Sequence, residues 1–288
     1  MIETLPSGIK LHVQDLPPAS GVAPSGKTVV LIHGLIIDDL SSYYFTLANP
    51  LSMAGHRVIM YDLRGHGASD RPATGYSVAD GVDDLRELLI QMKIQDPVHL
   101  VGNSYGGAIA MGMAVTYPEL VADVALIEGL YADVRFGEEM SETLGFLSKC
   151  IYEQKWRDWL AARDRKTNKV AQRGISLIDN TTIREDLLST APYPNICLQA
   201  LQIPLLAIYG SASDIFWRAQ KLAALVPQTR LIVLPGLDHR VLFNASPYVA
   251  RVLEWWLAGH TGEAPMWIPP DIPFEPAPLS RAMLLDQA

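Results

Sequence analysis

Short apolar runs alternate with amphipathic segments along most of this chain. The later runs are apolar throughout, which is typical of strands buried on both faces of a parallel sheet, and the segments between most of them predict helices. The alternation therefore predicts an α/β fold with a mostly parallel central sheet flanked by helices. The runs expected to form strands are residues 9–13, 28–33, 57–61, 98–102, 121–128, 204–209 and 229–234.

The alternation breaks after Glu128. The sequence then becomes helical and charged, with segments such as WRDWLAARDRK, until the strand pattern resumes at PLLAIY. We interpret residues 129–202 as a helical cap inserted into a core formed by residues 1–128 and 203–260.

A proline-rich tail, residues 261–288, follows the last amphipathic segment and cannot form a long helix before its end. Its Met266, Trp267, Ile268 and Phe274 are too apolar for a merely solvated linker. We expect the tail to lie along its own domain or along a partner subunit, so a dimer is one possible assembly.

The formal charge of -8 and the pI near 5.3 argue against nucleic acid or an anionic membrane as the main partner. The start, MIETLPSGIK, carries neither a basic leader nor an apolar signal core, so we expect a cytoplasmic protein. Cys150 and Cys197 have no zinc-site spacing and form no C-x-x-C pair, and we expect both to be reduced thiols.

The most informative segment is VHLVGNSYGG, in which an apolar run ends at a Gly-rich turn and a small-residue helical pattern follows. This order predicts a strand, a sharp turn with Ser104 at its apex, and a helix. The turn requires the small neighbours Gly102 and Gly106. It also places the Tyr105 backbone N–H at a helix start, where unpaired amides stabilise developing negative charge.

Chemistry at a serine hydroxyl requires a general base and a third group that orients the base. His239 is the histidine that sits in a loop after a late strand, and Asp214 is an acid just past the strand PLLAIY. We expect the set Ser104, Asp214 and His239. Glu128, at the end of an earlier strand, is the rival for the acid, whereas Asp238 is too close to His239 in the chain to orient it.

The elbow and the chain order of nucleophile, acid and base closely resemble the α/β-hydrolase superfamily, over about residues 9–258. Two further segments match: VVLIHG, which ends in the His-Gly pair of this family, and YDLRGHGASDRP. The resemblance implies that the backbone N–H groups of Leu35 and Tyr105 bind the oxyanion. We expect His33 to order the oxyanion loop and His66 to form contacts within RGHG.

The serine at the elbow argues against dehalogenation and epoxide opening, because relatives with those activities use aspartate there. Asn103 makes the elbow similar to that of the carbon-carbon hydrolases, which act on vinylogous diketones. The Leu-Ile-Ile-Asp-Asp loop after Gly34, and Arg240 after the histidine, differ from many of those enzymes. We therefore expect hydrolysis of a carboxylic ester, thioester or lactone of a small hydrophobic metabolite through an acyl-enzyme. A ligand-binding member of the fold without catalysis is the alternative from another class.

We expect neither a metal nor a cofactor, since no ligand spacing and no G-x-G-x-x-G turn is present. The partner is then a small-molecule substrate held by apolar residues that converge on the serine. Tyr152, Trp156 and Trp159 have helical spacing and are candidates for the roof of its pocket. The residues expected to bind substrate are Ile36, Leu130, Phe146, Trp156, Trp159, Phe216 and Val241.

Overall fold

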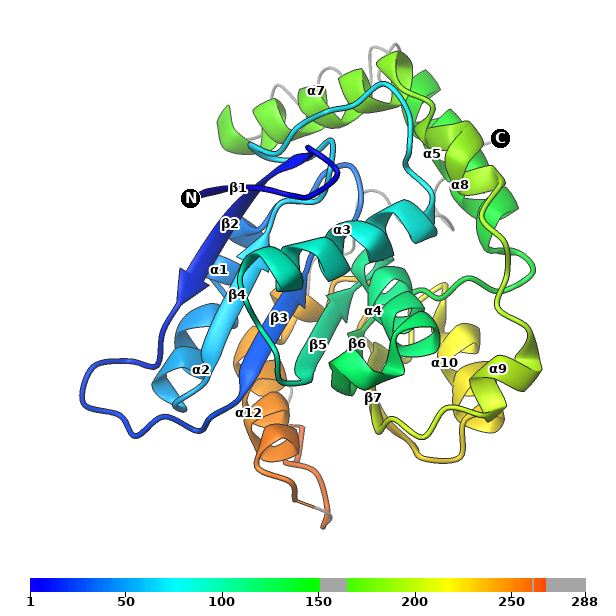
Figure 1. Cartoon of the computed structure of the whole chain (residues 1–288). Helices are drawn as coiled ribbons and strands as arrows, with labels where there is room; N and C mark the ends of the chain where they lie inside the picture. Colours follow the sequence, from blue (N-terminus) through cyan, green and yellow to red (C-terminus); the bar gives the residue numbers. More distant parts are fainter. Residues whose placement is uncertain (151–164, 261, 268–288) are drawn as a thin grey trace.

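The computed structural model describes residues 1–150, 165–260 and 262–267 (Figure 1). It confirms the expected α/β class, because the predicted apolar runs all form strands of one central sheet. The strands are β1 (Ile2–Thr4), β2 (Lys10–Leu16), β3 (Thr28–Ile32), β4 (Arg57–Tyr61), β5 (Val98–Asn103), β6 (Val121–Ile127), β7 (Leu205–Gly210) and β8 (Thr229–Leu234). The short strand β1 was not expected from the sequence.

The sheet has eight strands in the order β1-β2-β4-β3-β5-β6-β7-β8. From β4 to β8 every neighbouring pair is parallel, whereas β2 is antiparallel to both β1 and β4. The carboxyl ends of the parallel strands therefore meet at one edge, which is where ligands bind in open α/β sheets.

Helices cover both faces of this sheet and also form a separate group between β6 and β7 along the chain. The core helices are α1 (Ser41–Tyr44), α2 (Ala48–Met53), α3 (Val78–Gln91), α4 (Tyr105–Thr116), η1 (Pro118–Leu120), α10 (Phe216–Leu225), α11 (Val241–Asn244) and α12 (Ser246–Leu257). The separate group, which we call the helical insertion, comprises α5 (Phe136–Cys150), α7 (Arg165–Asn180), α8 (Ile183–Leu188) and α9 (Asn195–Gln199).

Alternate side chains of strand β3 point to opposite faces of the sheet and enter two separate hydrophobic clusters. Val30 and Ile32 face the cluster that includes apolar residues of α3 and α4. Val29 and Leu31 point the opposite way, into the cluster with α1, α2, α11 and α12. All four side chains are fully buried, so the continuous apolar run is explained by burial on both faces.

The helical insertion is held on the core by polar contacts. Arg218 of α10, almost fully buried, donates to Glu139 of α5 at 2.6 Å and pairs with Asp133 at 3.4 Å. On the other side, Asp186 of α8 accepts the backbone N–H groups of Gly75 and Tyr76, each at 2.9 Å. Figure 1 shows α5, α7 and α8 as a layer beyond one edge of the sheet.

The described part of the tail contacts α12. The ring of Trp267 packs edge to face on Tyr248 at 5.0 Å, and the Tyr248 hydroxyl donates to the Pro265 carbonyl at 2.8 Å. Met266 is 77% exposed, so it is not part of this packing. Ile268 and Phe274 lie outside the described residues. Among the described residues, none of the helices combines the length and apolar character that a bilayer span requires.

Helix α4 crosses the sheet so closely that Gly106 admits no side chain. A methyl group there would overlap the Ile32 carbonyl of β3 and lie 2.7 Å from the His33 carbonyl oxygen. We expect Gly106→Ala to lower the free energy of unfolding by about 3 kcal/mol, because the obstacle is rigid backbone. Urea denaturation at matched m-values measures this.

The matched control is Gly262→Ala, since a methyl group at that position meets no atom within 4 Å. Equal stability of the two variants would show that α4 can move away from β3 at little cost.

Candidate active site

Ser104 stands at the junction of β5 and α4 in a strained conformation, with φ 51° and ψ -120°. Two backbone hydrogen bonds hold Ser104 in this conformation. The Ser104 N–H donates to Ile127 O at 3.1 Å, and Leu130 N–H donates to Ser104 O at 2.8 Å. The turn is tight enough that a Cβ on Gly102 would lie 2.5 Å from Gly106 O. The predicted elbow is therefore present, and it presents the hydroxyl at the end of the strand.

The hydroxyl of Ser104 contacts His239, which follows β8. His239 Nε2 lies 3.0 Å from Ser104 Oγ, and His239 Nδ1 lies 3.2 Å from Oε2 of Glu128. A carboxylate can only accept, so Nδ1 carries the proton and Nε2 is free to accept the proton of the hydroxyl. We call Ser104, His239 and Glu128 together the hydrogen-bonded chain.

Glu128 is completely buried at the end of β6, with φ 49°. Its carboxylate also accepts the Gly210 N–H and the Ser213 hydroxyl, each at 2.5 Å. These donors stabilise a negative charge that burial alone would oppose. These hydrogen bonds fix the side chain of Glu128, which orients the imidazole of His239.

The structure does not place Asp214, the sequence-based choice for the orienting acid, in contact with His239. Asp214 is exposed, and no hydrogen bond in the described part of the chain joins it to His239. The loop after β7 directs the hydroxyl of Ser213 toward Glu128 and leaves Asp214 in solvent. Asp238 bonds to Arg240, as expected for a polar loop residue.

The proton affinity of His239 reflects these charges. Burial by itself lowers the pKa of the imidazole, but the hydrogen bond and charge of Glu128, together with the nearby carboxylates, raise the pKa above its ordinary value. Asp214 and Asp238 add smaller contributions in the same direction. Asp214 therefore acts on His239 through its charge alone.

Two backbone N–H groups belong to residues near Ser104. Tyr105 is the first residue of α4, and Leu35 follows Gly34, at which an added methyl group would lie 3.5 Å from Ser104 Cβ. Among the described residues, neither N–H has a hydrogen-bond acceptor. Backbone N–H groups without an acceptor can stabilise an oxyanion when they point at it. A strained serine that is hydrogen-bonded to an imidazole, which a carboxylate orients in turn, can attack a carbonyl.

Residues 27–246 match the model of a family described as the alpha/beta hydrolase fold. This chain belongs to that family. The matched segment contains the elbow at Ser104, the strands from β3 to β8 and His239, which follows the last strand.

Several known proteins are similar to this α/β hydrolase. A Mycobacterium tuberculosis protein is 39% identical over 115 residues, which are 39% of this chain and 33% of the relative, so the match spans about a third of that protein. A 2-(acetamidomethylene)succinate hydrolase of Mesorhizobium japonicum is 27% identical, over 75% of this chain and 83% of its own. A solved structure from work on carboxylesterases of Nitrososphaera gargenis has a TM-score of 0.73 at 25% identity, covering 90% and 98% of the two chains.

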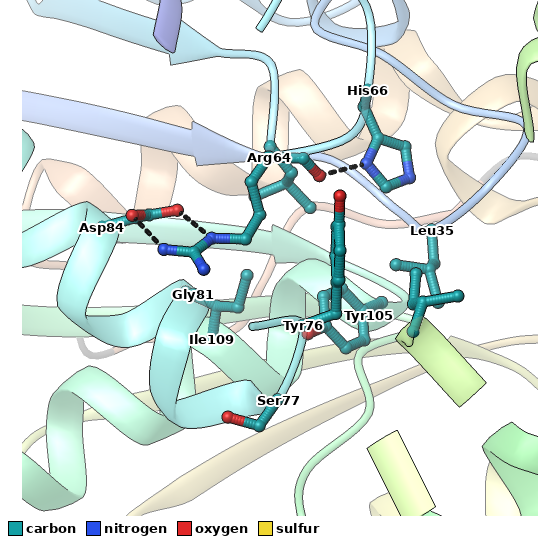
Figure 2. A pocket seen from close by; sticks show the side chains of 11 residues that line it. Leu35, Arg64, His66, Tyr76, Ser77, Gly81, Asp84, Tyr105 and Ile109 are labelled. Atoms are coloured by element: carbon teal, nitrogen blue, oxygen red, sulfur yellow. Dashed lines mark hydrogen bonds and ion pairs between the residues drawn. The ribbon is translucent and has the colours of Figure 1, made fainter. Parts of the chain in front are cut away.

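A small cavity of this α/β hydrolase lies beside the two candidate oxyanion residues (Figure 2). Figure 2 shows Leu35 and Tyr105 on one side of it and the paired side chains of Arg64 and Asp84 on another. Both Arg64–Asp84 hydrogen bonds are 2.6 Å long, so the charges at this wall are matched. The other lining residues are Leu63, His66, Tyr76, Ser77, Gly81, Ile109 and Ile183. The sequence did not single out Tyr76, Ile109 or Ile183, because nothing in their local pattern separates a lining residue from a core residue.

The residues expected to bind substrate are placed in different surroundings. Ile36, Leu130 and Val241 are buried core residues, and Val241 belongs to the cluster under α12. Phe146 and Phe216 are half-buried, at α5 and at the start of α10. Trp156 and Trp159, like Tyr152, lie outside the described residues.

The pKa of His239 tests the assignment of its partner. We expect the imidazole in the parent protein to titrate above the ordinary histidine value. Glu128→Gln should lower this pKa, because burial then acts against fewer opposing charges, whereas Asp214→Asn should lower it less. Carbon-detected NMR titration of labelled histidine measures all three values. A larger pKa shift from Asp214→Asn than from Glu128→Gln would show that Asp214, and not Glu128, is the partner of His239.

Proposed function

We propose that this α/β hydrolase is a serine hydrolase that cleaves a carboxylic ester, thioester or lactone through an acyl-enzyme. The observation that carries the proposal is the hydrogen-bonded chain: a strained Ser104 with its Oγ 3.0 Å from Nε2 of His239, which Glu128 orients. The similarity to a structure from a study of carboxylesterases supports the ester preference.

In the proposed reaction, Ser104 Oγ attacks the carbonyl carbon of the substrate while its proton passes to His239 Nε2. The charge of Glu128, 3.2 Å from Nδ1, stabilises the imidazolium that forms. The N–H groups of Leu35 and Tyr105 bind the carbonyl oxygen as it becomes an anion.

The tetrahedral intermediate then collapses, and His239 donates its proton to the leaving alkoxide or thiolate. The acyl group remains on Ser104. A water molecule gives a proton to His239 and attacks the acyl carbon, and the reverse proton transfer releases the acid and restores the serine. Each group is returned to its starting state, so no redox partner is needed.

The proposed substrate is a small hydrophobic metabolite. The side chains of Leu35 and Ile109 and the ring of Tyr105 border the cavity next to the candidate oxyanion site, and the nearby charges of Arg64 and Asp84 neutralise each other. Such a lining favours an apolar acyl or leaving group over a charged one.

The first test is covalent labelling of the intact chain with a fluorophosphonate. We expect one adduct per chain by intact mass in the parent protein and none in Ser104→Ala, because the probe requires an activated serine. A matched serine control is Ser211→Ala, since Ser211 is exposed after β7 and outside the hydrogen-bonded chain. The parent should then hydrolyse p-nitrophenyl butyrate faster than the acetate.

Two results would contradict the proposal. Identical labelling of the parent and Ser104→Ala would show that Ser104 is not the nucleophile. Binding of a ligand without turnover would favour a non-catalytic member of the fold. A kcat/KM for a ring-fission product far above that for esters would assign the chain to the carbon-carbon hydrolases instead.

A second test separates the two candidate acids by turnover. We expect Glu128→Gln to lower kcat about 10³- to 10⁴-fold, because an amide cannot stabilise the imidazolium or fix its tautomer. Asp214→Asn should stay within a few-fold of the parent, since only a distant charge is lost. Steady-state assays with the preferred ester measure both, and the opposite ranking of the two variants would overturn the proposed role of Glu128.

A further inference from the structure

The backbone after the candidate oxyanion residue Leu35 makes an unusual turn. The Ile37 N–H donates to Leu35 O at 3.0 Å, and the central residue, Ile36, has a φ of 70°. This left-handed conformation is strained for any residue except glycine and is a marked outlier for a β-branched side chain. The surrounding structure must hold Ile36 in place.

One support comes from the loop after β4. The Ile36 N–H donates to Nε2 of His66 at 2.8 Å, and Nδ1 of His66 donates to the Arg64 carbonyl at 2.9 Å. The second bond fixes the tautomer that leaves Nε2 free to accept. Burial, together with the nearby His33, lowers the pKa of His66 to about 3, so the ring stays neutral. Figure 2 shows the bond from His66 to the Arg64 carbonyl.

The other support comes from the helical insertion. Helix α7 passes Ile36 at Gly174, where an added Cβ would lie 2.5 Å from Ile36 Cγ2 and 2.7 Å from Ile36 O. One turn later Leu177 lies against Gly65, next to His66 in the chain. Helix α7 therefore contacts both the strained turn and the loop that supports it.

We propose that His66 and Gly174 are positioning residues that hold Ile36 in its left-handed conformation, so that the Leu35 N–H points at the oxyanion only while α7 is seated on the turn. This rests on the proposed function for the role of the Leu35 N–H. The helical insertion would thereby set the rate of the chemical step as well as the shape of the pocket.

The first experiment is Gly174→Ala in the full chain. We expect kcat for a p-nitrophenyl ester to fall about 10- to 100-fold, less than the full loss of an oxyanion donor, while KM stays within about threefold. Alanine favours helix more than glycine does, so α7 itself is not weakened. Gln172→Ala is the control, because Gln172 is exposed on the same helix, and it should match the parent.

The second experiment replaces the acceptor at residue 66. His66→Leu cannot accept the Ile36 N–H and should lower kcat by a similar factor, whereas the side-chain oxygen of His66→Gln can accept it and should restore most of the rate. A purely structural role for the ring would make both variants equally poor, and that result would overturn the assignment of His66.

Amide hydrogen exchange of the peptide over residues 33–40 gives a readout that needs no turnover. We expect faster exchange in Gly174→Ala and His66→Leu than in Gln172→Ala. Unchanged exchange in the first two variants overturns the inference whatever the activity of the parent. Faster exchange with unchanged kcat also overturns it, because the turn would then not aim the Leu35 N–H. A parent without Ser104-dependent turnover refutes the proposed function alone.

Discussion

Strained backbone at the carboxyl ends of neighbouring strands is the constraint on which this site depends. Ile36, Ser104 and Glu128 follow β3, β5 and β6, and each has a positive φ, at 70°, 51° and 49°. Such conformations cost roughly 1–3 kcal/mol each and persist only where the surroundings hold them. Here the sheet ladder, the close approach of α4 and the contact with α7 supply that support. The stability of the whole core is what holds these three residues in place at the carboxyl ends of the strands.

The same arrangement explains how a buried charge is tolerated. The carboxylate of Glu128 is out of water but accepts hydrogen bonds from Gly210, Ser213 and His239. In a low-dielectric surrounding, an anion with fixed donors orients an imidazole more firmly than an exposed carboxylate can. An exposed acid such as Asp214 adds charge at a distance but no fixed direction.

The helical insertion is fixed at several points of the core. Arg218 of the core donates to Glu139 of the insertion, Asp186 of the insertion accepts the Gly75 N–H of the core, and Gly174 brings α7 against the strained turn. A buried ion pair of this kind contributes little net stability, but it specifies one arrangement strongly because an unpaired partner would be costly. The insertion is thus positioned relative to the sheet with little freedom at these contacts.

The sequence by itself determined the strands from β2 to β8, the elbow and the pairing of Ser104 with His239, because these follow from local apolar runs, small residues at a tight turn and the order of strand ends. It did not determine which acid faces His239. Glu128 and Asp214 both follow adjacent strands, β6 and β7, and the choice depends on which side chain the loop after β7 leaves buried. Only the tertiary structure decided that choice, as it did the contact between Ile36 and Gly174, because both depend on packing between segments far apart in the chain.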